Sequence, residues 1–485
     1  HEHQHDGIYK SDLYNRDILC LFAASMYHQS NPRNGLCHYT YNVYKNEMEF
    51  IKIEHNKHQN IFEKIDSCKI DNINLCLVLA GIYQDNNATT QIDPQVVEAM
   101  QPYLSVYFGN ASSQHGYGVP VEKAIAKARE QVADFLGAEH PDEIIFTSCA
   151  TESDNTALWS ALWSQKGKTE IVTTPVEHPA IMQTCDFLSS HGATIKYLKV
   201  SNHGDLDLKE FENLLTPNTA LASVMWANNE TGNIYPVPEL AEIAYKHGVM
   251  FHTDAVQAVA KVPISLKDTK INMLSFSGHK IHAPKGIGVL YVRRGTRFIP
   301  FMKGGHQERG RRAGTENVPY IVGLGVACEL AKKNLSVVSS RVKALRDKLE
   351  QGILKAIPDC FVTGDESRRT DNTLNVAFKF VEGEAILLML NEYGIAASSG
   401  SACSSESLEP SHVMRAMNVP FSAAHGTIRF SLSRFTTEAE IDKTIEVLPG
   451  IISTLRKLSP YWKEGKPQIQ GLDHDFDADS KEVRA

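Results

Sequence analysis

Residues 249–280 read VMFHTDAVQAVAKVPISLKDTKINMLSFSGHK. A short apolar run rich in strand-forming residues lies near each end of this stretch, VMFHTDA at 249–255 and INMLSFS at 271–277. Each run ends in polar residues, the first at Asp254 and the second just before Lys280. Their length and composition predict two buried strands, which are the two ends of about one strand–helix–loop–strand unit.

The same rhythm continues on both sides of this stretch. Helical stretches or loops separate the runs, among them 121–136, whose apolar residues recur at steps of three and four. Short strand-forming runs that alternate with amphipathic helices predict βαβ units around a mostly parallel sheet, with helices on both faces. The further apolar runs occupy 143–148, 170–175, 193–200, 220–227 and 286–292.

Length and composition are those of a large globular chain. The 485 residues predict two to four domains, and 42% hydrophobic with 22% charged residues excludes a mostly disordered or fibrous protein. The formal net charge of −8, with no basic half, argues against a nucleic-acid partner. The most apolar run, 73–83, is too short to span a membrane.

The cysteine count and the first residues bear on the compartment. Nine cysteines form an odd set spread thinly over the chain, which favours free thiols in a reducing cytoplasm over a disulfide framework. The opening HEHQHDG has no basic region leading into an apolar stretch, so no secretory signal is expected. We therefore expect a cytoplasmic protein that binds neither nucleic acid nor membrane.

Residues 1–80 differ in texture from the rest of the chain. They hold seven of the twenty histidines and four of the nine cysteines, but only two glycines. No tight Cys/His spacing predicts a zinc site, and HEHQH at 1–5 is as typical of an expression tag as of a metal-binding tract. This extension has no role that its residues assign.

Lys280 and Asp254 form the first chemical pair. In open α/β sheets ligands bind at the carboxyl ends of the strands, where both residues are expected. A lysine beside a buried strand needs a partner or a lowered pKa, and such lysines form Schiff bases. A nearby carboxylate is what pyridoxal phosphate (PLP) requires, because it keeps the pyridine nitrogen protonated. Taken alone, Lys280 would be a surface lysine and Asp254 a helix N-cap.

Four other features add to this pair. SCATESDN at 148–155 follows a strand and opens a helix, so its backbone N–H groups and the Thr151 hydroxyl favour phosphate binding, although alone it is a good capping sequence. His178 offers a ring to stack on a pyridine, although a lone histidine is more often structural. Cys403 lies in a Gly/Ser-rich stretch typical of a mobile loop, where a thiol can act as nucleophile. Arg429 offers a planar fork for a substrate carboxylate, although alone it would be a surface arginine.

The strings that carry these residues resemble the PLP-dependent cysteine desulfurases, in the class V aminotransferase group. The resemblance covers residues from about 82 to about 461. The segments FTSCATESDN, MWANNETG and GGHQERGRRAGTEN are most similar to the nitrogen-fixation (NifS) type. Other matching strings are YQDNNATT, GNASSQHGYG, VEHPA, HTDAVQ, SGHKIHAPKG, SSGSAC, SLEPSHVMRAM and IRFSLSR.

The resemblance implies an α/β fold of the fold-type I PLP-dependent transferases. Residues 96–335 would form a large PLP-binding domain with a mostly parallel seven-stranded sheet. Residues 81–95 and 336–465 would form a smaller α/β C-terminal domain that carries the catalytic-cysteine loop. Residues 1–80 have no counterpart in the family pattern, and the polar acidic tail at 466–485 is expected to be disordered.

The resemblance also implies a role for each site residue. Lys280 would hold PLP covalently, His178 would stack on the ring and shuttle protons, and Cys403 would attack the substrate sulfur. The other implied contacts are Asp254 to the pyridine nitrogen, Gln257 to the phenolic oxygen, Ala150, Thr151, Ser277 and His279 to the phosphate, Thr315 to the phosphate from a second subunit, Asn228 to substrate and cofactor, and Arg429 to the substrate carboxylate.

The implied reaction converts L-cysteine into L-alanine and leaves a persulfide on Cys403. The sulfur would go to an iron–sulfur scaffold protein, for nitrogenase in the NifS type, and the persulfide of Cys403 would be the contact to iron–sulfur metal. Thr315 implies an obligate homodimer with composite sites. Two alternatives stay open: a selenocysteine lyase or other PLP-dependent β-elimination enzyme, and a non-catalytic assembly platform.

Overall fold

The computed structural model describes residues 37–42, 47–52, 81–399, 410–463 and 466–467. The chain divides into two compact units, His1–Gly81 and Ile82–Ala485. In the first unit, β1 (Cys37–Asn42) and β2 (Glu47–Lys52) pair in antiparallel fashion. The HEHQH tract and nearly all of the acidic tail lie outside the described residues, so the expectations for them stay predictions.

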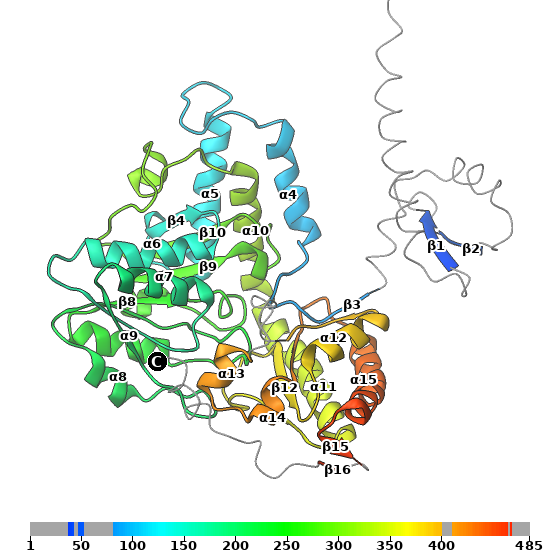
Figure 1. Cartoon of the computed structure of the whole chain (residues 1–485). Coiled ribbons are helices and arrows are strands. Elements are labelled where there is room, and N and C mark those ends of the chain that lie inside the picture. Colours follow the sequence, from blue (N-terminus) through cyan, green and yellow to red (C-terminus); the bar gives the residue numbers. More distant parts are fainter. Residues whose placement is uncertain (1–36, 43–46, 53–80, 400–409, 464–465, 468–485) are drawn as a thin grey trace, which may run out of the picture. The chain divides into compact units, whose positions relative to one another are not determined.

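A seven-stranded sheet forms the centre of the second unit, with the strand order β4-β10-β9-β8-β7-β5-β6. Strands β4, β10, β9 and β8 are labelled in Figure 1. Strands β9, β8, β7, β5 and β6 run parallel to one another, whereas β10 is antiparallel to both β4 and β9. The predicted mostly parallel seven-stranded sheet is confirmed. Its strands are β4 (Ile144–Thr147), β5 (Glu170–Thr173), β6 (Thr194–Tyr197), β7 (Thr219–Ser223), β8 (Met250–Asp254), β9 (Met273–Ser277) and β10 (Gly288–Val292).

Helices cover both faces of this sheet. In β4, Ile144 and Phe146 pack in one hydrophobic cluster and Ile145 packs in another, because successive side chains of a strand point to opposite faces. Helix α5 buries the predicted apolar face and ends at Gly137, whose φ of 60° is the left-handed conformation of a helix C-cap. The helices of this part are α4 (Pro94–Ser105), α5 (Val119–Leu136), α6 (Ala150–Trp163), α7 (Pro179–Ser190), α8 (Leu208–Leu214), α9 (Val237–Lys246) and α10 (Val318–Val337).

The C-terminal part of this unit has a sheet and a hydrophobic cluster of its own. The antiparallel sheet has the order β11-β12-β14, from β11 (Cys360–Val362), β12 (Thr373–Phe378) and β14 (Thr427–Ser431). Phe378 and Phe430 are fully buried among apolar side chains of the surrounding helices. These helices are α11 (Lys343–Ala356), α12 (Gly383–Glu392) and α15 (Glu438–Leu458). The short α13 (His412–Ala416) and α14 (Phe421–Ala424) precede β14 in the chain.

The first strand of the unit returns to this C-terminal part. β3 (Ile82–Tyr83) pairs in parallel with β13 (Ile395–Ala396), and an isolated bridge joins Asp85 to Ser431. The predicted boundaries between a large and a small domain stay a prediction. The remaining elements are η2 (Pro141–Glu143), η3 (Leu266–Asp268), η4 (Gly278–Lys280), η5 (Gln307–Gly310), the π-turn η6 (Val338–Val342), and the pair β15 (Trp462–Lys463) and β16 (Lys466–Pro467). No helix in the part of the chain described here is long and apolar enough to cross a membrane.

Candidate active site

The strand order brings several predicted residues to one edge of the seven-stranded sheet. Gly288, the first residue of β10, pairs with Thr147 at the end of β4 and with Ser277 at the end of β9. A Cβ at position 288 would lie 2.6 Å from the carbonyl carbon of Cys149, so only glycine fits there. This close approach seats the start of α6 against β10, and Ala150 therefore lies at the same edge as Ser277.

The N-terminus of α6 has the geometry of an anion site. Cys149 at its N-cap gives no side-chain hydrogen bond to the first turn, so N–H groups remain for a ligand. Thr151 is exposed in this turn. Glu152 accepts from the backbone N–H of Ser148 at 2.7 Å and pairs with Arg312 at 2.8 Å. Three residues beyond Arg312, Thr315 is exposed.

Lys280 and Gln257 converge on a single backbone carbonyl. Lys280 follows β9, and its Nζ donates to the carbonyl oxygens of Asn87 at 2.5 Å and of Ala88 at 2.8 Å. The Nε2 of Gln257 donates to the same Asn87 oxygen at 3.0 Å. His279, next to Lys280, has its Nδ1 3.2 Å from Thr89 Oγ1, and burial lowers the pKa of its ring to about 4.

The buried Asp254 and the partly buried His178 interact electrostatically next to Lys280. Asp254 ends β8 and accepts from the backbone N–H of Val256 at 2.9 Å. Burial raises the pKa of its carboxyl group, while His178 and then Lys280 act in the opposite direction. His178 is the N-cap of α7, where its Nδ1 accepts from the Ala180 N–H at 3.1 Å. This contact places the proton of the neutral ring on Nε2, and burial lowers the ring's pKa.

Asn228 builds the turn at the other end of the site. Its Nδ2 donates to the carbonyl oxygen of Val176 at 3.1 Å, and its Oδ1 accepts from the N–H groups of Glu230 and Thr231 at 2.9 and 3.0 Å. The amide of this fully buried residue is therefore used to shape the chain. The turn presents the carbonyl oxygen of Asn229 toward Arg429.

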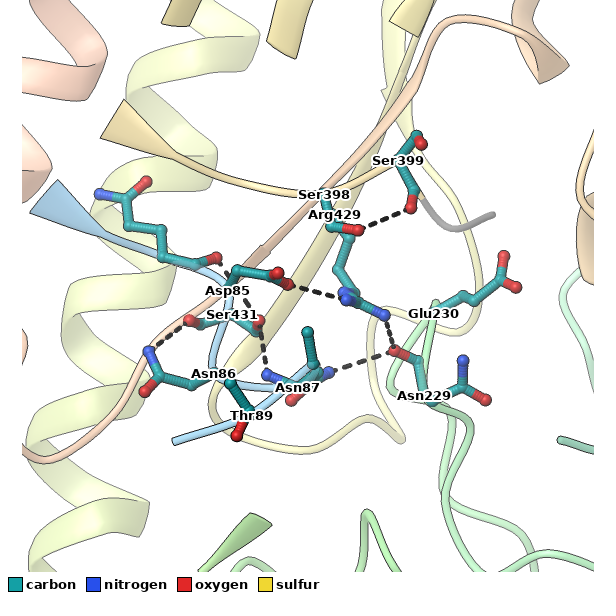
Figure 2. A network of polar contacts seen from close by, with 12 residues as sticks. Asp85, Asn86, Asn87, Thr89, Asn229, Glu230, Ser398, Ser399, Arg429 and Ser431 are labelled. Carbon is teal, nitrogen blue, oxygen red and sulfur yellow. Dashed lines mark hydrogen bonds and ion pairs between the residues drawn. The ribbon is translucent and has the colours of Figure 1, made fainter. Parts of the chain in front are cut away.

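Arg429 is buried on β14 between two acceptors (Figure 2). One guanidinium nitrogen donates to the Asn229 carbonyl oxygen and another to Asp85 Oδ1, both at 2.8 Å. Its Nε has no hydrogen-bond partner among the described residues. Because a buried donor without a partner is costly, this N–H is a candidate contact for a ligand's oxygen.

Cys403 lies outside the described residues, and so does the predicted iron–sulfur contact through it. The chain on its N-terminal side is held by backbone hydrogen bonds between Ser398 and Arg429, at 3.2 and 2.6 Å. On its C-terminal side, Ser411 Oγ donates to Glu230 Oε2 at 2.6 Å. The four cysteines whose side chains are described, Cys149, Cys185, Cys328 and Cys360, are free thiols. Within the described ranges no cluster of three or more His, Cys, Asp or Glu is arranged to hold a metal ion.

The residue-by-residue interpretation missed four polar groups of this site. Asp85 and Asn87 lie in YQDNNATT, where consecutive polar residues directly after a short apolar run were a usable signal. Glu177 precedes His178, and burial raises the pKa of its carboxyl group to about 8. Lys261 contacts both Gln257 and Asn87. No spacing in the sequence distinguishes this lysine from the exposed ones.

The comparisons with known proteins point to one family. Residues 82–444 match the family model described as aminotransferase class-V. A cysteine desulfurase NifS of Azotobacter vinelandii is 59% identical over 389 residues, which cover 80% of this chain and 97% of that protein. A cysteine desulfurase of Gluconacetobacter diazotrophicus is 58% identical over 79% of this chain and 96% of its own length.

A solved structure shares the fold as well. A NifS-like protein is 40% identical and superposes with a TM-score of 0.73 over 77% of this chain and all of its own. The matched family model spans most of the chain, and these relatives are covered over nearly their whole length. The chain therefore belongs to the class V aminotransferase family, in its group of cysteine desulfurases.

Proposed function

We propose that this chain is a PLP-dependent cysteine desulfurase that converts L-cysteine into L-alanine and leaves a persulfide on Cys403. The observation that carries the proposal is the meeting of Lys280, Asp254 and His178 at the sheet edge where α6 begins. An amine, a buried carboxylate and a neutral imidazole beside a helix N-terminus are the groups that PLP uses.

The residues present fit this cofactor. Lys280 would bind it covalently, Asp254 would pair with its ring nitrogen, and His178 would stack on its ring. Gln257 would donate to its phenolic oxygen. The phosphate would lie at the N-terminus of α6, among Ala150, Thr151, Ser277 and His279, with Thr315 reaching it from the second subunit of a homodimer. When bound, PLP supplies the electron sink that stabilises negative charge on the substrate carbon.

The chain itself binds and orients the amino acid. Arg429 would bind the substrate carboxylate, because its Nε–H has no partner among the described residues and its other nitrogens already lie in fixed positions. Asn228 would lie beside substrate and cofactor, and it holds the turn that carries Asn229. His178 holds its proton on Nε2 and Lys280 carries an amine, so these two groups would move protons to and from the substrate.

Cys403 would complete the sulfur transfer. Its thiolate attacks the sulfur of bound L-cysteine, the sulfur–carbon bond breaks, and the electron pair returns to the carbon, which is protonated to give L-alanine. The products are L-alanine and the Cys403 persulfide, so every atom is accounted for. An iron–sulfur scaffold protein in the cytoplasm, serving nitrogenase as the resemblance of the sequence strings to the NifS type implies, would accept this sulfur.

The decisive test measures L-alanine and protein persulfide formed from L-cysteine by the purified chain with PLP, with residues 1–80 present and removed. In a single turnover we expect both products in equal amounts. With a thiol reductant present to release the persulfide sulfur as sulfide, Cys403→Ala should abolish sulfide release and keep the visible absorbance of the lysine-bound cofactor, whereas the control Cys360→Ala should behave as wild type. Full turnover in Cys403→Ala would refute the assigned nucleophile, and activity only with L-selenocysteine would favour a selenocysteine lyase.

A further inference from the structure

A second lysine lies behind the cofactor lysine. Lys261 Nζ is 2.5 Å from Gln257 Oε1 and 3.2 Å from Asn87 Oδ1. Burial lowers the pKa of this lysine well below its ordinary value, and the neighbouring charges of Lys280 and Arg429 act in the same direction. An amine in either protonation state has hydrogens for both oxygens, so the two contacts do not depend on its charge.

These contacts fix the orientation of the Gln257 amide. Its Oε1 accepts from Lys261, while its Nε2 donates to the Asn87 carbonyl oxygen at 3.0 Å. A flipped amide would bring Oε1 against that carbonyl oxygen and the NH₂ group against the lysine amine. The first pairing would be unfavourable because oxygen would face oxygen, and the second would be unfavourable for the protonated amine, which has no lone pair to accept with.

Asn87 connects the two lysines. Its backbone oxygen accepts from Lys280 Nζ as well as from Gln257, and its side-chain Oδ1 accepts from Lys261. The same Oδ1 also accepts from Asn372 Nδ2 at 3.0 Å, which holds the side chain from the C-terminal part. The position of Lys261 is therefore set independently of Lys280.

We propose that Lys261 is a positioning residue that acts through Gln257. It holds the Gln257 amide with its NH₂ group on the side of Lys280, where that group donates to the phenolic oxygen of PLP. The inference rests on the proposed function, because it assumes that PLP binds at Lys280. It adds a residue that touches neither cofactor nor substrate and that controls the protonation of the lysine–cofactor bond.

Other charged groups also act on this bond and must stay unchanged in the test. Lys280 is faced by Asp254 at the end of β8 and by His178 at the start of α7. Lys261 is faced by Lys280 itself, by Arg429 on β14 and by His282. None of these groups is substituted in the variants below.

The main experiment titrates the visible absorbance of the lysine-bound cofactor against pH. In Lys261→Met the Oε1 of Gln257 loses the hydrogen bond from Lys261 that orients the amide. The hydrogen bond that the amide NH₂ group donates to the phenolic oxygen then weakens. Because that donation disfavours the protonated form of the lysine–cofactor bond, we expect the titration midpoint to rise by about one pH unit. Lys261→Gln is a second variant; its side chain is shorter by one atom, and the midpoint should rise in it as well.

Two comparisons isolate the path through Gln257. Gln257→Leu should raise the midpoint by itself, and the double variant Lys261→Met/Gln257→Leu should titrate as Gln257→Leu does. Additive shifts would mean that Lys261 acts by its charge alone and would overturn the proposal. Lys267→Met removes an exposed lysine six residues away and should keep the wild-type midpoint.

The outcomes separate this inference from the proposed function. If the wild-type chain forms no visible lysine–cofactor absorbance with PLP, the proposed function itself is wrong. If wild type forms it and both Lys261 variants titrate with the wild-type midpoint, Lys261 has no positioning role and the function stands. The inference is supported if the midpoint is raised in either Lys261 variant and if adding Lys261→Met to Gln257→Leu raises it no further.

Discussion

The cofactor end and the substrate end of the site are built in different ways. Asp254 ends β8 and Lys280 follows the neighbouring parallel strand β9, so the strand order brings them together. Arg429 instead meets Asp85 and Asn229, which lie 344 and 200 positions away in the chain. The placement of Asp254 and Lys280 thus depends on one sheet, whereas the substrate contacts depend on the return of the first strand to the C-terminal part through β3 and β13.

The largest effect is expected at the cofactor end, from Lys280→Ala. The variant lacks the amine that binds PLP and moves the substrate proton, so turnover of L-cysteine should fall by about 10³-fold or more. Borohydride reduction should trap no cofactor on the protein, as measured by mass spectrometry. Lys285→Ala removes an exposed lysine five residues later and serves as the control. A cofactor that is still trapped in Lys280→Ala would place the covalent bond on another residue.

At the substrate end, Arg429→Gln should raise the KM for L-cysteine by about 100-fold, because a charge-assisted hydrogen bond contributes about 1.5–3 kcal/mol. Arg429→Lys keeps the charge without the planar fork and should recover only part of the loss. Steady-state kinetics and the cofactor spectrum check both variants, and the spectrum should stay that of wild type. Arg434→Gln breaks a comparable ion pair with Asp93 and should leave KM within about twofold. An equal rise of KM in Arg434→Gln would show that the effect comes from a general disturbance of the structure and not from loss of a substrate contact.

The same contrast explains how much could be predicted from the sequence. The strands and their polar ends are local patterns. The sheet, and the position of Lys280, Asp254 and His178 at the ends of its strands, could therefore be predicted from the alternation of strand-forming runs with helices and from the strings that match the family. The ion pair between Arg429 and Asp85 joins residues far apart in the chain, and no local pattern indicates it. Lys261 was missed for a related reason, because its partner Asn87 lies 174 positions away in the chain. Cys403 lies outside the described residues, so its role stays a prediction.

A smaller effect is expected from Gly288→Ala, which tests how tightly α6 is seated at the cofactor end. The new Cβ would meet the backbone of Cys149 at 2.6 to 2.9 Å, and the backbone cannot yield as a flexible side chain does. We expect a loss of about 1–3 kcal/mol in the free energy of unfolding and weaker PLP binding. Denaturant titration and fluorescence measure the two effects. Gly450→Ala, on α15 with open space around the new Cβ, should instead stabilise by about 0.5–1 kcal/mol.

The last prediction concerns Glu177, which directly precedes His178 and whose backbone oxygen accepts from His412 Nε2 on α13 at 2.9 Å. Its Oε1 accepts from Thr174 Oγ1 at 2.7 Å and from the Met225 N–H at 2.9 Å, whereas its Oε2 has no partner among the described residues. Burial therefore raises the pKa of the carboxyl group from 4.5 to about 8.

This raised pKa fixes the sign of a pH dependence. Between pH 4.5 and about 8 the folded chain holds a proton on Glu177 that the unfolded chain releases, so its stabilising contribution is complete below pH 4.5 and disappears as pH rises through about 8. The neutral amide of Glu177→Gln removes this dependence, and the unfolding free energies of variant and wild type should diverge by about 1.4 kcal/mol per pH unit between about pH 5.5 and 7.5. Urea denaturation at several pH values measures the difference, in which the titrating histidines common to both proteins cancel. Glu139 is exposed, so the free energy of unfolding of Glu139→Gln should depend on pH as that of wild type does. If Glu177→Gln also shows the wild-type pH dependence, Glu177 is ionised in the folded protein, and the prediction from its burial is wrong.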